Sequence, residues 1–350
     1  MEFPLTSEAA LPGLPFVQIS ALLQQEAQAH GLDLDRVQDH AGRESQIICK
    51  LADGEIGARS WAEGSILHVR AASPDWLFTL RETVTSHLTE TAPEQAILLR
   101  WSDLAHPGKT PPNFSLAEVE DLKPLGDHFF RLRLRGDNLD RLARDMIHFR
   151  LILPRPDVTR PQWPVTGANG QTIWPEGAHA LHRPAYTVRA IDPAAGWLDA
   201  DIFRHPGGRV CTWASGIEKG AQVGLTGPGG GGVPVAQNLL IGGDETAYPA
   251  LARSIEAQSP ECEGQCWLFG HVKDYPLPCH PRIRIIHAPG GEADLARGLA
   301  QNGTRAERIW IATEKSRILP LRQIIHQDLG IARQQARLVA YWNRSTDPKG

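Results

Sequence analysis

The chain has 350 residues, of which 41% are hydrophobic and 22% are charged. This length exceeds one typical domain and predicts two or three domains, each large enough to bury its own core. The net charge of −4 gives no global positive field, which argues against a nucleic-acid partner. No apolar run is long enough to span a bilayer, and Met1 to Pro4 lacks the basic and apolar segments of a secretory signal.

The cysteines favour a reducing compartment. Their number, five, is odd, and a long chain without a signal sequence is typical of free thiols in the cytosol. Cys262 and Cys266 are spaced Cys-x-x-x-Cys, whereas zinc sites commonly use a two-residue gap. We therefore expect a cytoplasmic protein with no membrane span and no metal site.

Residues 1–103 have the pattern of a small α+β domain. Apolar residues recur at helical spacing from Val17 to His30, and short apolar runs between turn residues indicate strands. No residue pattern here demands chemistry, so the partner of this domain is unknown. The expected elements are a helix over 17–30, strands over 45–51 and 65–69, a helix capped by Ser73 that runs to about Thr89, and a strand over 96–101.

A second domain is expected over 114–232, after a Pro- and Gly-containing linker candidate at 102–113. Its short strands are punctuated by turns, with little helix between them, which indicates an antiparallel barrel or a sandwich. The strands are expected within 115–135, 148–153, 185–191, 198–203 and 222–226, and 161–177 is expected to be mostly loop.

The pattern changes after Gly232, and strands then alternate with helices over 236–345. This alternation predicts a parallel sheet that is covered on both faces. The glycine run 227–232 lacks the Lys-Ser/Thr of a phosphate-binding P-loop, so a turn between domains is favoured over a phosphate cradle. Strands are expected over 238–241, 265–270, 284–287, 308–312 and 336–341, with helices over 247–258, 292–301 and 318–329.

Two segments of the second domain suit a flavin. Ala185–Arg189 offers an aromatic ring for packing, a hydroxyl for hydrogen bonding and an arginine for phosphate contact. In His205–Ala214, Gly207 and Gly208 let backbone amides approach a pyrophosphate, and the start of a helix adds partial positive charge. A plain strand and an ordinary Pro-Gly-Gly turn are the alternatives, and each segment taken alone leaves them open.

Gly243 to Ala247 is a third candidate, because it directly follows the apolar strand 238–241. Ligands of open α/β sheets bind at this edge. Thr246 is expected to cap the next helix, with nearby amides facing a nucleotide phosphate. The segment lacks the three-glycine dinucleotide fingerprint, which favours transient binding of NADPH or NADH. A capped helix without a ligand is the alternative.

Together these segments resemble the siderophore-interacting protein family, whose members are flavin-dependent ferric-siderophore reductases related to the ferredoxin–NADP reductase superfamily. The resemblance covers about Ser115 to Ser345, and residues 1–103 resemble a small uncharacterised domain fused to some such proteins. It implies a multidomain chain with an N-terminal α+β domain over 1–103, an antiparallel β-barrel FAD domain over 114–232 and a C-terminal α/β parallel-sheet NAD(P)H-binding domain over 236–345. The matching segments are 148–154, the Trp163/Trp174 loop, 186–189, 205–214, 243–250, 310–314 with 321–322, and 341–344.

The resemblance also implies which residues hold the cofactors. The flavin carries the redox step, so no catalytic side chain is expected. Tyr186 and Thr187 position the flavin ring, and Trp342 covers it near the path of the hydride. The expected cofactor-binding residues are Arg183, Tyr186, Thr187, Val188, Arg189, His205, Gly207, Gly208, Cys211, Thr212, Trp213, Ala214, Gly243, Asp244, Glu245, Thr246, Ala247, Glu314 and Trp342.

Three departures from the family pattern affect these expectations. Pro184 stands where the family usually has arginine, and Arg183 lies one residue earlier, so Arg189 or Arg209 is an alternative phosphate contact. Thr313 replaces a glycine beside the nicotinamide position. The C-terminal signature carries Asn343 and Ser345 where arginine and glycine are common.

The expected function is ferric-siderophore reduction with FAD and with NADPH or NADH as donor, the ferric siderophore being the substrate. Reduction to Fe(II) weakens binding by hard oxygen ligands and so releases the iron. A flavin reductase with another acceptor and a non-catalytic siderophore-binding protein are the alternatives. If residues 1–103 are a separate partner-binding module, their deletion is expected to leave flavin reduction intact.

Overall fold

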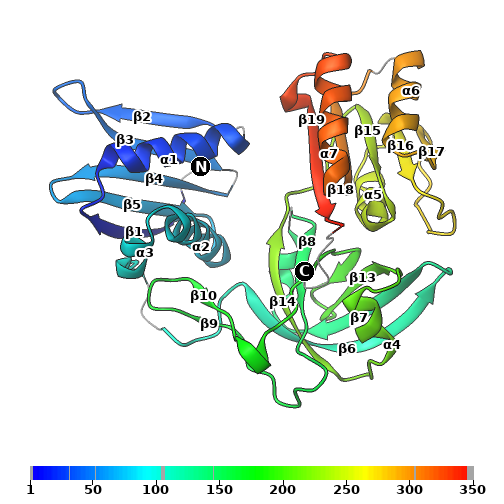
Figure 1. The fold of residues 1–350 in the computed structure, drawn as a ribbon, viewed down its shortest axis with the longest axis horizontal. Helices are drawn as coiled ribbons and strands as arrows, with labels where there is room; N and C mark the ends of the chain where they lie inside the picture. The colour runs from blue at the N-terminus through cyan, green and yellow to red at the C-terminus, as the bar shows by residue number, and fades with distance from the viewer. Residues whose placement is uncertain are drawn as a thin grey trace. The chain divides into compact units, whose positions relative to one another are not determined.

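The fold divides into two compact units, each described by itself (Figure 1). The computed structural model describes residues 3–30, 32–51, 53–103, 107–144, 146–302 and 305–344. Unit 1 comprises Met1–Phe114 with Leu153–His182, and unit 2 comprises Ser115–Ile152 with Arg183–Gly350. Residues 153–182, expected within the flavin-binding domain, thus pack with the N-terminal segment. We call them the insertion, because they interrupt unit 2 in the sequence.

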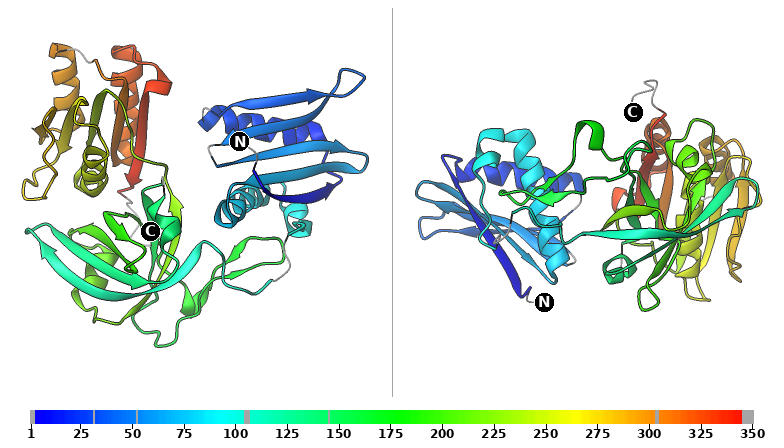
Figure 2. Two further views of the ribbon diagram at one scale, coloured as in Figure 1. Left: turned by 180° about the vertical axis from the view of Figure 1, so that it is seen from behind. Right: turned by 90° about the horizontal axis from the view of Figure 1, so that it is seen from below.

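Unit 1 is built on a five-stranded antiparallel sheet. Ala9 and Leu11 are buried and alternate with exposed residues, as expected for a strand with one covered face. The helices α1 (Phe16–His30) and α2 (Pro74–Thr91) pack on that same face (Figure 2). The strand order is β1 (Leu5–Pro12), β5 (Gly64–Ala71), β4 (Gly54–Trp61), β3 (Glu44–Leu51) and β2 (Leu34–Gln38).

The helix after Ser73 is confirmed, and the strand expected over 96–101 is wrong. The Ser73 hydroxyl accepts from the backbone N–H of Trp76 (3.3 Å), with proline in the first helical position. Residues Pro93–Leu98 instead form a second helix, α3, which also begins with a proline. Trp101 is buried and donates its indole N–H to the Thr85 hydroxyl at 3.1 Å.

Unit 2 begins with a seven-stranded antiparallel sheet. The strand expected over 185–191 is divided into β11 and β12, which lie at opposite edges of this sheet. Val188 N–H donates to the carbonyl of Ile147, and Arg189 N–H donates to that of Asp199, each at 2.8 Å, so the two edges approach each other at these residues. The order is β11 (Ala185–Thr187), β8 (His148–Ile152), β14 (Gln222–Gly229), β6 (Phe114–Leu125), β7 (Phe129–Gly136), β13 (Trp197–Phe203) and β12 (Ala190–Asp192).

The second sheet of unit 2 has five parallel strands, as the alternating pattern predicts. Leu239 and Ile241 belong to one buried cluster and Leu240 to another, so both faces are covered. The strands in spatial order are β17 (Ile283–Ala288), β16 (Glu263–Phe269), β15 (Asn238–Gly243), β18 (Arg308–Glu314) and β19 (Ala336–Trp342), with helices α5 (Tyr248–Glu256), α6 (Glu292–Asn302) and α7 (Lys315–Arg322).

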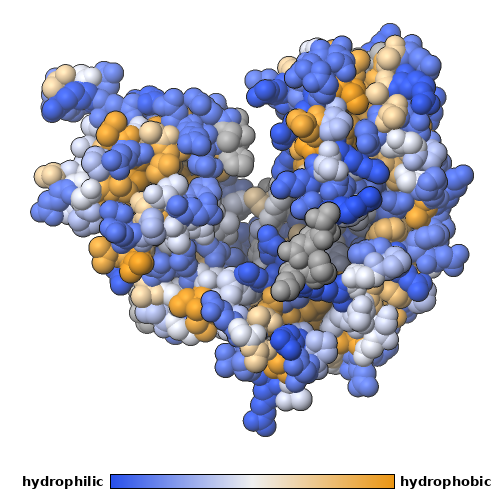
Figure 3. All heavy atoms as spheres, viewed as in Figure 1, coloured by the Kyte–Doolittle hydropathy of each residue, from blue (hydrophilic) through white to orange (hydrophobic). Residues whose placement is uncertain are grey.

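Two general findings complete the fold. Among the described residues, no helix is long and apolar enough to cross a membrane, and no group of three or more His, Cys, Asp or Glu side chains is arranged to hold a metal ion. The face drawn in Figure 3 is mostly hydrophilic, with hydrophobic side chains in small separate groups.

Candidate functional site

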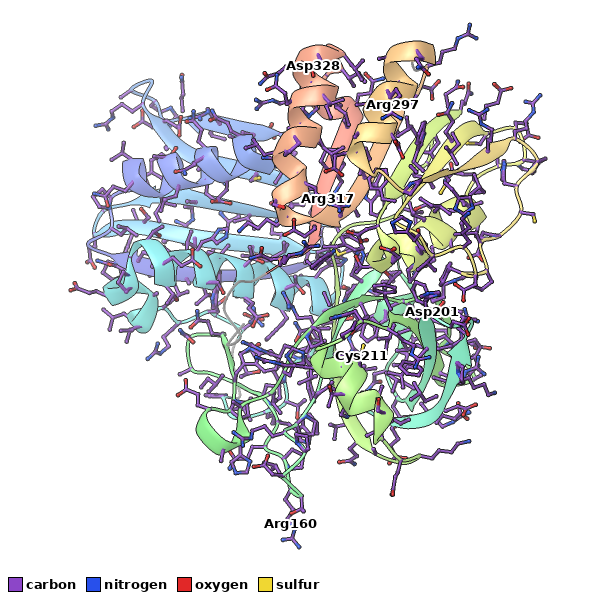
Figure 4. All side chains as sticks on the ribbon, turned by 45° about the vertical axis from the view of Figure 1, so that its right-hand side comes forward. Arg160, Asp201, Cys211, Arg297, Arg317 and Asp328 are labelled. Carbon is purple, nitrogen blue, oxygen red and sulfur yellow. The ribbon has the colours of Figure 1, made fainter. Side chains whose placement is uncertain are left out.

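The predicted flavin strand β11 lies next to β8, with Tyr186 paired to Phe149 and Thr187 paired to His148. Burial raises the pKa of the Tyr186 phenol, and the nearby Cys211 thiol raises it further. Cys211 belongs to α4 (Arg209–Ser215), the short helix that follows the two glycines (Figure 4). The structure therefore brings the two predicted flavin segments, 185–189 and 205–214, together.

The loop before α4 is open at Gly207 and tight at Gly208. Gly207 has φ +78°, and a Cβ built on it would meet no atom within 4 Å. A Cβ on Gly208 would come within 2.8 Å of the His205 ring and 3.1 Å of the Cys211 sulfur. Within the described residues, no side chain caps this helix, and its first backbone N–H groups have no acceptor inside the helix. These donors suit the oxygens of a pyrophosphate.

Arg189, a predicted phosphate contact, is held by an acidic partner in this structure. Its guanidinium donates to both carboxylate oxygens of Glu256, at 3.0 and 2.8 Å. Its side chain is only 13% exposed and lies 3.9 Å from Asp201, a buried β13 carboxylate labelled in Figure 4. Contact with a phosphate would require the Glu256 pair to open.

Asp244 is the centre of the predicted nicotinamide site at the end of β15. Its Oδ1 accepts from the N–H and the hydroxyl of Thr246, at 3.1 and 2.5 Å. Its Oδ2 accepts from the Thr313 hydroxyl (2.9 Å) and the Glu314 N–H (3.1 Å). The Trp342 indole N–H donates to the same Oδ2 at 2.9 Å. With 4% exposure and five hydrogen bonds, this carboxylate holds the site together.

The expectation that Thr246 caps the following helix is wrong. Asp244 is the capping residue of the one-turn 3₁₀ helix Glu245–Ala247, and the Thr246 hydroxyl donates to it. Gly243 is required by packing, since a Cβ there would lie 2.3 Å from the Ala312 carbonyl oxygen and 2.7 Å from the Ala247 Cβ. Strand and helix therefore approach at a distance that only glycine permits.

Glu314 fixes the end of β18. Its carboxylate caps α7 by accepting from the N–H of Ser316 at 2.7 Å and from the Ser316 hydroxyl, and it accepts from the backbone N–H of Arg344 at 3.0 Å. The Ser316 hydroxyl, followed by the Arg344 N–H, holds the pKa of Glu314 below its usual value. Glu245 accepts from the His271 N–H at 3.3 Å.

Two adjacent residues of β19 connect the flavin strand to the parallel sheet. The Trp342 indole donates to Asp244, whereas the Tyr341 hydroxyl lies 2.5 Å from the Nε2 of His148, the β8 residue that pairs with Thr187 on the predicted flavin strand. Burial, with the nearby Arg337 and Arg253, lowers the pKa of His148 to about 4. His148 is therefore neutral at pH 7.

The predicted site residues thus form two groups within unit 2. One group lies around β11 and α4, and the other lies at the ends of β15, β18 and β19. Val188, Ala214 and Ala247 are buried and offer at most their backbone to a ligand. Sequence reasoning left Tyr341 and His148 out of the site, although both lie in segments that resemble the family: the C-terminal Tyr-Trp pair and the strand 148–154.

Comparisons with known proteins identify the family. The sequence pattern of the siderophore-interacting FAD-binding domain matches residues 118–232, and that of the siderophore-interacting protein matches residues 236–345. Residues 118–345 belong to the siderophore-interacting protein family.

Named relatives agree with this family membership. The chain is 27% identical over 243 residues to the ferric vibriobactin reductase ViuB of Vibrio cholerae, which covers 63% of this chain and 86% of ViuB. It is 23% identical over 169 residues to the ferric acinetobactin reductase of Acinetobacter baumannii, which covers 45% of this chain and 59% of that protein. These similarities support an oxidoreductase with an FAD-binding domain.

The siderophore-interacting protein SipS from Aeromonas hydrophila has a similar fold, with a TM-score of 0.55 at 20% identity. The match covers 66% of this chain and 99% of SipS.

Thr313, which stands where the siderophore-interacting family usually has glycine, has a structural role in this protein. Its side chain is fully buried, and its hydroxyl donates to Asp244.

Proposed function

We propose that this protein is an FAD-dependent ferric-siderophore reductase with NADH or NADPH as its electron donor. When bound, FAD supplies the redox chemistry, because it can accept a hydride and pass on electrons one at a time. The substrate is a siderophore-bound Fe(III), and its reduction to Fe(II) loosens hard oxygen ligands and releases the iron.

The observation that carries this proposal is the pair Tyr341–Trp342. The Tyr341 hydroxyl lies 2.5 Å from the Nε2 of His148, which pairs with Thr187 of the predicted flavin strand, and Trp342 bonds to Asp244 on the predicted nicotinamide side. Hydride transfer requires the two cofactors to be adjacent, and this pair joins their predicted sites. The names of the reductases ViuB and the acinetobactin enzyme support the same reaction.

The residues around α4 fit the flavin nucleotide. The open Gly207 turn and the first N–H groups of α4 would hold the pyrophosphate, with Arg209 in the first turn adding positive charge. Tyr186 would pack on the ring, and the Thr187 hydroxyl would hydrogen-bond to it. The half-buried Tyr186 and the buried Val188 limit the access of water to this strand.

The residues at the parallel-sheet edge would position the nicotinamide without contributing a proton. The Asp244 carboxylate is fully used in holding Thr246, Glu314 and Trp342 in place. The indole of Trp342 is 37% exposed, so it can cover a ring that enters this side. We assign Glu245 and Glu314 to the same nicotinamide side.

A visible spectrum tests the proposal. The purified protein, after incubation with FAD and removal of the excess, should show flavin absorption bands, and NADH or NADPH should bleach them without oxygen. Addition of a ferric siderophore should restore the bands and form Fe(II), detected with a ferrous chelator. Protein that does not bind flavin would refute the proposal, whereas bleaching that only a protein or free flavin reverses would favour a flavin reductase with another acceptor.

A further inference from the structure

The insertion 153–182 packs against the helices α2 and α3 of unit 1. Glu82 and Thr89 are seven residues apart on α2 and so share one side of that helix, whereas Ala96 lies on α3, beyond the helix break at Ala92. The Glu82 carboxylate accepts from the Thr172 N–H at 3.2 Å, and the Gln171 amide donates to the Thr89 hydroxyl at 2.8 Å. The Asn169 amide donates to the Ala96 carbonyl at 3.4 Å.

These contacts hold a hairpin that is too short to be stable alone. Its strands β9 (Val165–Thr166) and β10 (Thr172–Ile173) have only two residues each. The segment after the α+β domain also bonds to strand β9 of this hairpin. The Gly108 N–H donates to the Thr166 carbonyl (2.7 Å), and the Thr166 N–H donates to the Lys109 carbonyl (2.8 Å). Phe114 also packs on Trp163, with ring centroids 5.7 Å apart.

The two ends of the insertion lead directly into the predicted flavin strand. Leu153 and His182 exchange backbone hydrogen bonds of 2.8 and 2.9 Å. The same antiparallel pairing continues from Ala185 opposite Arg150 to Thr187 opposite His148. The pairing of β8 with β11 therefore extends into the two ends of the insertion, and the β9–β10 hairpin farther along the insertion contacts α2 and α3 (Figure 1).

We propose that the N-terminal α+β segment is an anchor that positions β11 through the insertion. Glu82, Thr89 and Ala96 are the docking surface, and the β9–β10 hairpin is its occupant within the same chain. The insertion has few backbone donors of its own, because five of its residues are prolines without a backbone N–H: Pro154, Pro156, Pro161, Pro164 and Pro175. On this basis, deletion of residues 1–103 disturbs the flavin strand, contrary to the expectation for a separate module.

Hydrogen exchange on the full-length protein tests the anchor. The variant E82A/Q171A loses two of the docking hydrogen bonds, and amides in 165–173 should exchange about 10-fold faster than in the wild type. The matched control E90A/Q162A changes one exposed glutamate of α2 and one exposed glutamine of the insertion, both outside the docking contacts, and should exchange at the wild-type rate. E82Q, which keeps an acceptor oxygen, should also remain near the wild-type rate.

A second readout tests whether the anchor reaches β11. Amides of 183–187 should exchange about 3-fold faster in E82A/Q171A, and the dissociation constant for FAD should rise about 3- to 10-fold. Unchanged exchange in 165–173 would overturn the anchor, and unchanged exchange in 183–187 would overturn the positioning of β11. Only the FAD readout depends on the proposed function. If the wild type fails to bind FAD, the exchange data still decide the inference.

Discussion

The edge of the parallel sheet and the loop around α4 are built in opposite ways. At the sheet edge, Asp244 bonds to Thr246, Thr313, Glu314 and Trp342, so these polar groups are paired within the protein. At α4, no side chain of the described residues caps the helix, and the turn before it has open space at Gly207. Some residues of a binding motif therefore build the site, whereas others leave room for the ligand.

The largest expected effect comes from removing the centre of the sheet edge. D244A leaves the N–H or hydroxyl donors of Thr313, Trp342 and Glu314 without their acceptor, each at a cost of about 1–3 kcal/mol. We expect the unfolding free energy of unit 2 to fall by about 4 kcal/mol and NAD(P)H-dependent bleaching to be lost. Thermal or urea unfolding and stopped-flow absorbance measure the two effects.

The control for this variant is D328A, which removes an exposed carboxylate near the end of the π-helical turn Gln323–Asp328 (Figure 4). It should change stability by less than about 0.5 kcal/mol. If D244A is as stable as D328A, Asp244 does not build the site, and the contrast between the two regions fails.

The second effect concerns His148, which lies at the junction of the two regions. Its pKa is lowered to about 4 in the folded protein, against about 6.5 in an unfolded chain. Between pH 4 and pH 6.5, His148 therefore takes up a proton when the protein unfolds. The stability that His148 contributes is fully present above pH 6.5 and is lost as the pH falls to 4. The unfolding free energy lost in this way is about 3 kcal/mol, and this loss should be absent in H148Q.

The measurement is the unfolding free energy from pH 7 to pH 4 for both proteins. Carboxylates titrate in the same range, so only the difference between wild type and H148Q reports on His148. Parallel curves for the two proteins would contradict a half-buried, neutral His148 beside Tyr341.

The third prediction addresses the open loop. G207V places a β-branched side chain at φ +78° beside the N–H groups of α4, where it obstructs a phosphate. We expect the dissociation constant for FAD to rise at least 10-fold, measured by quenching of flavin fluorescence. G220V is the matched control, because Gly220 is also exposed, has φ +83° and has open space around its Cβ position. Equal losses of affinity in the two variants would show that strain alone is responsible.

The smallest effect is expected at Thr313. T313G restores the residue usual in the family but loses the hydroxyl bonded to Asp244, so stability should fall by about 1–2 kcal/mol. The rate of bleaching by NADH should change less than about 3-fold, because the side chain is buried. T313S keeps the hydroxyl and should retain most of the stability. A large gain in rate for T313G would show that Thr313 obstructs the nicotinamide.

Apolar runs and capping residues in the sequence correctly predicted several strands and helices. The apolar run 238–241 lies within β15, and Ser73 caps α2 as expected. Strand β4 was missed, because its sequence Gly-Glu-Ile-Gly-Ala-Arg-Ser-Trp has no apolar run. The division of 185–191 into β11 and β12 could not be predicted locally, since it depends on partners far along the chain: Ala185 pairs with Arg150, and Ala190 pairs with Asp199.

The candidate site has the same limit, because contacts between residues far apart in the chain could not be predicted from local sequence. The glycines and the order of segments were enough to locate both candidate halves. The role of Asp244 was not predictable, because its partners Thr313 and Trp342 lie about 70 and 100 residues later in the chain, on β18 and β19. The ion pair between Arg189 and Glu256 is equally remote in sequence, and it changes what Arg189 can offer a phosphate.

The chain leaves and re-enters unit 1, passing between the two units after residues 114, 152 and 182. During synthesis, the α+β segment emerges first but cannot make its α2 and α3 contacts with the insertion until the insertion has been translated. By then β6, β7 and β8 have also emerged, while β11 to β14 and the parallel sheet are still to come. The N-terminal unit is therefore completed late, after three of the seven strands of the antiparallel sheet have been made, and the two units mature together rather than one after the other.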